Sequence, residues 1–280
     1  MSLIIKRIYL SFIKNKDVSK AYASIIYQIK DLKTFNYYKM EAIEKRKVGG
    51  IVAENFRTAK VFTEYGIDFC CKGGITLEAA CENHGVLLQD LIKDLLMVGS
   101  MSEERKYKDM GMSELIDHII NTHHSYVENN IPPIKAYLQK LAHVHGDRHP
   151  ELHEIKQLFF EAADGLALHM KKEELILFPY IKAMQASEEN GFPLSPPHFG
   201  HIDNPIAMME HEHDTEGERF RKISELSRSY QTPADGCQTY RVTFAMLKEF
   251  EEDLHTHIHL ENNILFPRAK ALYETMNTAS

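Results

Sequence analysis

The chain has 280 residues, which is enough for one large domain or two modest ones. Hydrophobic residues make up 44% of it, yet no uninterrupted apolar run approaches the about 20 residues of a membrane-spanning helix, so we expect no membrane partner. The formal net charge of −7 argues against a nucleic-acid partner, because phosphate binding needs a basic face. Four cysteines, two of them adjacent, do not form the pattern of an extracellular disulfide framework, so the expected location is cytoplasmic.

Residues 1–45 are rich in Lys, Tyr and Ile and show no clear repeat. Lysine and arginine interrupt the apolar residues of the opening segment, and no small-residue cleavage site follows it, so it is not typical of a signal peptide. A compact unit begins near Met40, which is followed by EAIEKRKVGGIVAENF. We interpret residues 1–45 as a leader of doubtful authenticity, above all over residues 1–39, and a genuine extra helix is the alternative.

Residues 46–100 alternate short helical patterns with glycine-bearing turns and are expected to form a small helical domain. The loop DFCCKGG within it carries the adjacent pair Cys70 and Cys71. The nearby Lys72 favours the thiolate, and a disulfide between neighbouring cysteines is strained and labile, so the pair is a candidate catalytic redox site. The alternative is that both are small packed residues. The other two thiols are expected to be ordinary and semi-buried, namely Cys81 and Cys237.

A polar stretch over residues 98–112 is interpreted as a linker. Residues 113–275 then contain four long helical patterns, separated by the breaks HVHGDRHP, EENGFPLSPPHFGHIDNP and SYQTPADGC. Four helices joined by turn-rich breaks predict a four-helix bundle. The expected fold is therefore all-α, with a small cysteine-bearing helical domain followed by the bundle.

The bundle histidines are interpreted from the spacing of apolar residues, which recur every three or four positions along the buried seam of a helix. The second and last helices each carry a His and a Glu four residues apart on such a seam. The segments HMKKEELILFP and HIHLENNILFP share six residues at the same offsets, as expected of a two-fold site. The seams are Ala162, Leu166, His169, Glu173, Ile176 and Tyr180, and Thr243, Leu247, Phe250, Leu254, His257, Glu261 and Ile264.

The other two bundle helices also place histidines on their seams. In the third helix His213 lies on the seam, whereas His211 lies about 200° around the helix and faces away. In the first helix the seam passes through His124, although His123 also fits locally. The predicted site therefore contains six side chains from four helices: His124, His169, Glu173, His213, His257 and Glu261.

The negative charge of a glutamate on an apolar seam needs a compensating group, because burying an isolated carboxylate costs several kcal/mol. Imidazole and carboxylate together suit iron, manganese or zinc, and carboxylates from facing helices can bridge two metals. A structural zinc site usually contains thiolates, and the ferritin pattern is Glu-x-x-His rather than His-x-x-x-Glu. A di-iron centre therefore fits best. The alternative is that these residues pair with one another as polar members of the core.

The remaining histidines are interpreted as bystanders. Four of them surround the first inter-helix turn and are expected on the solvated surface, with a second metal site as the alternative: His143, His145, His149 and His153. His255 and His259 flank a candidate ligand by two residues and so face elsewhere. His84 precedes Gly85 and is expected to close a short helix, where a cationic ring suits the helix dipole.

From about Val48 to Ala271 the chain resembles the repair of iron centres family, a group of hemerythrin-like di-iron proteins. The motifs that carry the resemblance are EHEHD at residues 210–214, the two His-x-x-x-Glu segments with their Phe-Pro ends, and DFCCKGG. The family's ligands match the same six side chains, and the match favours His124 over His123. The residues before Met40 have no counterpart in the family.

The resemblance implies two iron ions in an oxo-bridged di-iron centre and a role in repairing iron–sulfur clusters after oxidative or nitrosative stress, by supplying iron from a labile site. The implied partners are damaged iron–sulfur cluster proteins and small diatomic gases, and a homodimer is an allowed assembly. Two alternatives stay open. One is a carrier or sensor of oxygen or nitric oxide, and the other is an oxidoreductase that reduces nitric oxide with electrons from the cysteines.

Overall fold

A computed structural model describes residues 43–55, 58–99 and 107–278. The leader assigned to residues 1–39 lies outside these ranges, as does part of the predicted linker. Within the described ranges the regular structure is helical and includes no β-strand, apart from one isolated bridge between Lys47 and Thr76. The expectation of an all-α fold is confirmed.

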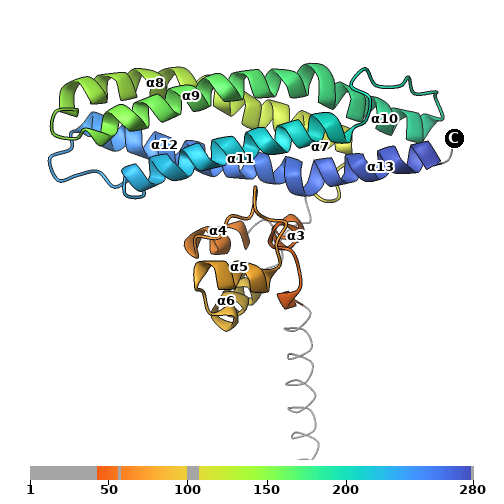
Figure 1. Cartoon of the computed structure of the whole chain (residues 1–280), viewed down its shortest axis with the longest axis horizontal. Coiled ribbons are helices and arrows are strands. Elements are labelled where there is room, and N and C mark those ends of the chain that lie inside the picture. The colour runs from red at the N-terminus through yellow and green to blue at the C-terminus, as the bar shows by residue number, and fades with distance from the viewer. Residues whose placement is uncertain (1–42, 56–57, 100–106, 279–280) are drawn as a thin grey trace, which may run out of the picture.

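The described residues of the small domain form four short helices, which lie below the bundle in Figure 1. They are α3 (Val48–Glu54), α4 (Thr58–Glu64), α5 (Leu77–His84) and α6 (Leu88–Gly99). α5 begins where the Thr76 hydroxyl accepts a hydrogen bond from the N–H of Ala79, and it ends before Gly85, whose φ of 64° is left-handed. His84 therefore closes this helix, as predicted. The core of the domain includes fully buried side chains such as Phe62, Leu77 and Leu91.

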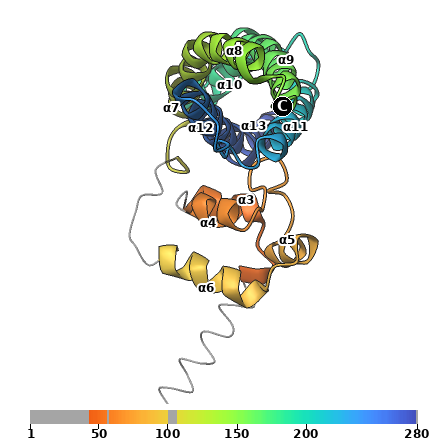
Figure 2. The ribbon, with the colours of Figure 1, turned by 90° about the vertical axis from the view of Figure 1, so that its left-hand side faces the viewer.

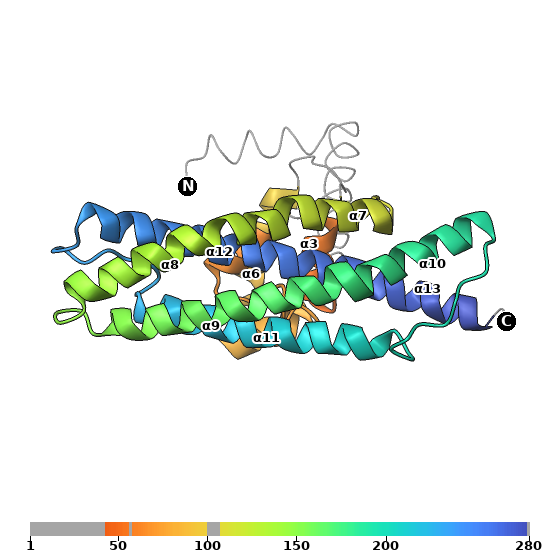
Figure 3. The same ribbon diagram turned by 90° about the horizontal axis from the view of Figure 1, so that it is seen from above.

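The bundle has four long helical rods, and one π-helical turn (η) interrupts three of them. Figure 2 looks along the rods and shows them around a common axis, and Figure 3 shows their lengths from above. In chain order the rods are α7 (Met112–Ile119), η1 (Ile120–His124) and α8 (Ser125–His145); α9 (Glu151–Lys172), η2 (Glu173–Leu177) and α10 (Phe178–Asn190); α11 (Asp203–Leu226); and α12 (Gln238–Leu260), η3 (Glu261–Leu265) and α13 (Phe266–Thr278).

The predicted seam of the last rod is buried along its length, but the seam of the second rod changes face after Glu173. Ile176 is 52% exposed and Tyr180 is half-buried, while Leu177 and Phe178 are buried. The cause is η2, because a π-turn bonds residue i to i+5 and thereby rotates every later side chain. The assignment of Ile176 to the seam is therefore wrong, since it assumes a continuous α-helix, whereas Tyr180 still packs against the core while partly buried.

The small domain docks on the side of the bundle through the loop that carries the cysteine pair (Figure 1). The Asn263 amide donates hydrogen bonds to the carbonyl oxygens of Phe69 and Cys70, at 3.4 and 3.2 Å. The Phe69 ring packs edge-on against the rings of His255 and His259. These two histidines thus face the small domain rather than the predicted metal site.

Gly49 allows this close approach, since a Cβ there would lie 2.1 Å from Oδ1 of Asn263. Gly49→Ala is expected to displace the Asn263 amide and weaken docking by about 1 kcal/mol, the contribution of a typical hydrogen bond. Hydrogen exchange of the amides in residues 68–74 should become faster. Gly50→Ala is the control, because a Cβ there would meet Lys47 Cβ at an ordinary 3.9 Å. Equal exchange in the two variants would show that Gly49 has no part in docking.

Candidate metal centre

The three π-turns of the bundle lie at candidate metal ligands. η1 ends at His124, η2 begins at Glu173 and η3 begins at Glu261. π-turns inside α-helices are rare and are frequently found at functional sites. The fourth rod, α11, supplies His213 from regular α-helix. The backbone of three rods thus departs from α-helical geometry where the polar side chains meet.

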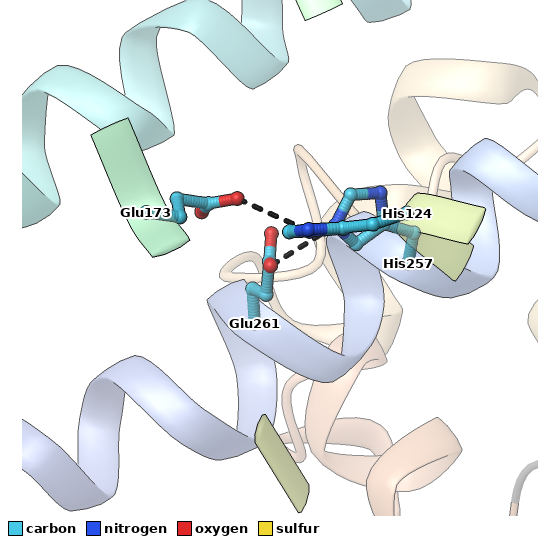
Figure 4. Close-up of side chains that lie close together, drawn as sticks. All are labelled: His124, Glu173, His257 and Glu261. Carbon is cyan, nitrogen blue, oxygen red and sulfur yellow. Dashed lines mark hydrogen bonds and ion pairs between the residues drawn. The ribbon is translucent and has the colours of Figure 1, made fainter. Parts of the chain in front are cut away.

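Four candidate ligands form the cluster shown in Figure 4, namely His124, Glu173, His257 and Glu261. Nε2 of His124 lies 3.4 Å from Oε2 of Glu173 and 3.2 Å from Nε2 of His257. Nε2 of His257 lies 3.0 Å from Oε1 of Glu261. Two imidazoles and two carboxylates therefore direct ligand atoms at one small volume between the helices.

The same two glutamates belong to a second cluster, with His169 and His213. Nε2 of His169 lies 3.3 Å from Oε2 of Glu173, and Nε2 of His213 lies 3.0 Å from Oε2 of Glu261. The two imidazole Nε2 atoms are 3.0 Å apart. Within each cluster, all the ligand atoms lie within 4.8 Å of one another. Each carboxylate is thus shared by both clusters, which is the arrangement of carboxylates that bridge two metals.

The shared carboxylates are buried beside the imidazole groups of the two clusters. Glu173 and Glu261 have 0% relative exposure, and among the described residues neither oxygen of Glu173 has a hydrogen-bond partner of good geometry. Burial raises the pKa of Glu261, but the charge of His257 and hydrogen bonds from His213 outweigh it and hold the pKa well below its usual range. Burial lowers the pKa of His169, yet Glu173 raises it to about 10. A bound cation would replace these imidazole protons.

Three of the four histidines are oriented by a partner on Nδ1. Such a partner holds the proton on Nδ1 and leaves Nε2 to face a metal. Sequence reasoning missed these partners, although each is adjacent in the sequence to a candidate ligand. The pairs are His124 with Oε1 of Glu174 at 2.7 Å, His169 with Oε2 of Glu212 at 2.9 Å, and His213 with Oδ1 of Asn262 at 2.9 Å.

The structure places His124, rather than its neighbour His123, in the cluster. The His123 ring stacks parallel to the His257 ring, with centroids 5.8 Å apart, and its Nδ1 lies 2.9 Å from Oδ1 of Asp253. On α11, His211 is exposed while His213 is buried. The seam spacing therefore distinguishes the histidines that enter the clusters from those beside them.

The cysteine loop reaches the backbone of one candidate ligand. Oδ1 of Asp68 accepts hydrogen bonds from the N–H groups of Cys70 and Cys71, each at 3.0 Å. The two sulfurs are 3.9 Å apart, and both are free thiols. The Cys71 thiol donates to the carbonyl oxygen of His213, 3.6 Å away. Gly217 makes room for this contact, since a Cβ there would lie 3.2 Å from the Cys71 sulfur.

The expectation that Lys72 favours a thiolate is wrong for Cys70. The adjacent Cys71 thiol raises the pKa of Cys70, and burial and the charge of Asp68 raise it further, to well above its usual value. Oδ1 of Asp68 lies 3.2 Å from the Cys70 sulfur, whereas Lys72 is exposed. Cys70 is therefore held as a thiol in this loop conformation.

Two expectations about the bystander residues are also wrong. His145 is buried rather than solvated, and its Nε2 lies 3.3 Å from Sγ of Cys237. Cys237 is exposed and Cys81 is buried, so neither is semi-buried. The burial of His145 has a signal in the sequence, because it follows Leu141 by four residues and continues the seam of α8.

Comparison with known proteins decides the family. The Hemerythrin HHE cation binding domain matches residues 115–269, and a Domain of Unknown function (DUF542) matches residues 44–98. The probable iron–sulfur cluster repair protein of Haemophilus influenzae is 34% identical over 216 residues, which cover 75% of this chain and 89% of that protein. The chain belongs to the hemerythrin-like family of iron–sulfur cluster repair proteins.

Two further members of the iron–sulfur cluster repair family have similar coverage. The repair protein YtfE of Musicola paradisiaca is 31% identical over 226 residues, or 80% of this chain and 96% of that protein. The repair protein ScdA of Staphylococcus haemolyticus is 30% identical over 220 residues, or 78% of this chain and 95% of that protein. The resemblance found from the motifs is confirmed. Within the described ranges of the present chain, no helix is both long and apolar enough to span a membrane.

A hemerythrin-like domain implies iron binding, and the two His/Glu clusters of this chain are suitable for that metal. Imidazole and carboxylate groups are suitable ligands for iron. Within the part of the chain that the structure describes, the oxygens of Glu173 and Nδ1 of His257 have no hydrogen-bond partner, so the centre contains buried polar atoms without compensation. A cation at the shared carboxylates would supply it.

Two histidines on the same helix provide a matched test of the centre. His213→Ala removes an Nε2 atom from the second cluster. It should weaken iron binding by more than the about 10–100-fold that is typical when a group hydrogen-bonded to a metal ligand is removed. His211→Ala alters an exposed side chain and should leave iron binding unchanged. Bound iron per chain is measured after dialysis, with the fold checked by circular dichroism. Equal iron loss in two folded variants would show that the clusters are wrongly assigned.

Proposed function

We propose that the chain repairs iron–sulfur clusters damaged by oxidative or nitrosative stress, in the cytoplasm, by supplying iron held in the bundle. Its relatives carry the name iron–sulfur cluster repair protein. The observation that carries the proposal is the pair of clusters that share Glu173 and Glu261. We assign one iron ion to each cluster of an oxo-bridged pair, with six protein ligands: His124, His169, Glu173, His213, His257 and Glu261.

The surroundings of the clusters support release of iron as well as binding. Two imidazoles and two shared carboxylates would hold each iron without filling all of its coordination positions, so other ligands could bind there. Glu174 and Glu212 contact the candidate ligands His124 and His169, yet their side chains are 35% and 28% exposed. A single, partly exposed side chain therefore separates each of these two histidines from solvent. Iron bound there would supply the metal that a damaged cluster has lost.

The cysteine loop supports a redox step near the centre. Cys70 and Cys71 are free thiols whose sulfurs are 3.9 Å apart, and closing a disulfide between them would release two electrons and two protons. The Cys71 contact with the His213 carbonyl oxygen links this loop to the helix that supplies a ligand. We assign the pair the role of electron donor in repair.

The alternative functions use the same open iron positions. A carrier or sensor would bind oxygen or nitric oxide and retain its iron, whereas an oxidoreductase would reduce nitric oxide with electrons from Cys70 and Cys71. The docked thiols favour the two functions that require electrons over a simple carrier, because reversible gas binding has no use for a thiol pair. Iron transfer then distinguishes repair from reduction of nitric oxide.

Replacing Cys70 and Cys71 together with serine tests the role of the pair. Iron content and equilibrium nitric oxide binding should stay at wild-type values, because neither sulfur belongs to the two His/Glu clusters. Repair of a damaged cluster enzyme should fall at least about tenfold, because serine cannot cycle between thiol and disulfide. Transfer of iron to an apo cluster protein is measured on the same samples.

The matched control is Lys72→Ala, which alters an exposed side chain of the same loop and should leave repair unchanged. Full repair by the double serine variant would mean that the cysteines only pack. Loss of iron from it would assign the thiols a direct role in metal binding. Wild-type protein that reduces nitric oxide but transfers no iron would favour the oxidoreductase over repair.

A further inference from the structure

The fourth cysteine of the chain, Cys237, lies at the end of the bundle where α8 turns into α9 and α11 joins α12 (Figures 1 and 3). Cys237 is exposed and precedes the first residue of α12, so its sulfur sits at the N-terminus of a 23-residue helix. The backbone N–H groups of Tyr240 and Thr239 lower the pKa of the Cys237 thiol. Such N–H groups and the helix dipole stabilise a thiolate.

A buried histidine is directed at this sulfur. His145 is 6% exposed, and its Nε2 lies 3.3 Å from Sγ of Cys237. Its Nδ1 has no hydrogen-bond partner in the described part of the chain, so the sulfur is the hydrogen-bond contact of this ring. The ring packs edge-on against Tyr240, with centroids 5.6 Å apart. Packing against Tyr240 of α12 thus holds a ring nitrogen of His145, at the end of α8, beside the exposed thiol of Cys237.

The loop before α12 is also held in place. Asp235 contacts Nε2 of His149 at 3.0 Å and the Arg148 guanidinium at 3.0 Å, so the loop is tied to the α8–α9 turn. Gly236 allows a tight turn there, since a Cβ would lie 2.4 Å from the Thr232 side chain and 2.9 Å from a backbone oxygen. These contacts keep the sulfur close to its histidine without covering it.

We propose that Cys237 and His145 form a reactive thiol site that undergoes thiol–disulfide exchange with low-molecular-weight disulfides. His145 accepts the thiol proton at Nε2, and the Cys237 thiolate attacks one sulfur of the disulfide. The disulfide bond breaks as the new bond to Cys237 forms, and the departing thiolate takes the proton from His145. The Cys237 thiol is oxidised to a mixed disulfide while the departing sulfur of the small disulfide is reduced to a thiol, so oxidation and reduction balance. This site is independent of the iron centre.

Hydroxyethyl disulfide, an uncharged probe, tests the site in the full chain. Peptide mass spectrometry measures the rate of adduct formation at each cysteine, and the same cysteine in urea-unfolded protein is the reference. At pH 7, folded Cys237 should react about three to five times faster than the reference, because its larger thiolate fraction outweighs the lower nucleophilicity of each thiolate. Its rate should also reach its plateau at lower pH than the reference.

His145→Gln should bring the rate at Cys237 back towards the reference, whereas His143→Gln changes an exposed histidine of the same helix end and should not. Circular dichroism checks both folds. A Cys237 rate no greater than the reference, with the same pH dependence, would overturn the proposal without any variant. Equal rates in the two histidine variants and the wild-type chain would exclude a role for His145.

Discussion

The structure of the bundle depends on two buried carboxylates, Glu173 and Glu261, which neither solvent nor a backbone N–H of the described residues reaches. Each would cost several kcal/mol to bury without compensation. Imidazole rings from all four rods surround them, and three of the rods change to π-helical geometry beside a ligand. The need to place four imidazoles around two shared carboxylates explains why three rods depart from regular α-helix at this level.

One π-turn connects the metal centre to the small domain. Three consecutive residues of η3 have different partners: Glu261 belongs to both clusters, Asn262 contacts Nδ1 of His213, and Asn263 binds the carbonyl oxygens of the cysteine loop. The same loop returns to α11, where Cys71 contacts the His213 carbonyl oxygen. The loop therefore contacts the backbone of a candidate ligand, and it also binds the residue next to that ligand's Nδ1 partner. Contacts of the small domain thus extend to both the backbone and the side-chain surroundings of His213.

Sequence reasoning finds the candidate ligands because helical spacing converts position into direction. His213 and His211 differ by two residues, and that difference alone separates a buried from an exposed ring. The same reasoning fails at Ile176, since a π-turn is not visible in apolar spacing and shifts the seam that follows it.

Contacts between different elements also cannot be predicted from helical spacing. The proximity of Lys72 in the sequence does not reveal that Asp68 is the charged group beside the Cys70 sulfur. The pairing of His145 with Cys237 likewise joins two turns far apart in the chain. Neither contact follows from the sequence, because loop conformation decides which side chains meet, whereas periodicity describes only one helix at a time.

The sharing of the two carboxylates is tested most directly by anaerobic titration of iron-free protein with ferrous iron, followed by Mössbauer spectroscopy. We expect saturation at two irons per chain, one for each cluster. We also expect Glu173→Ala to weaken both iron sites together, because Glu173 belongs to both clusters. Saturation at one iron per chain, or a Glu173→Ala variant in which one site keeps its full affinity, would contradict the sharing of the carboxylates.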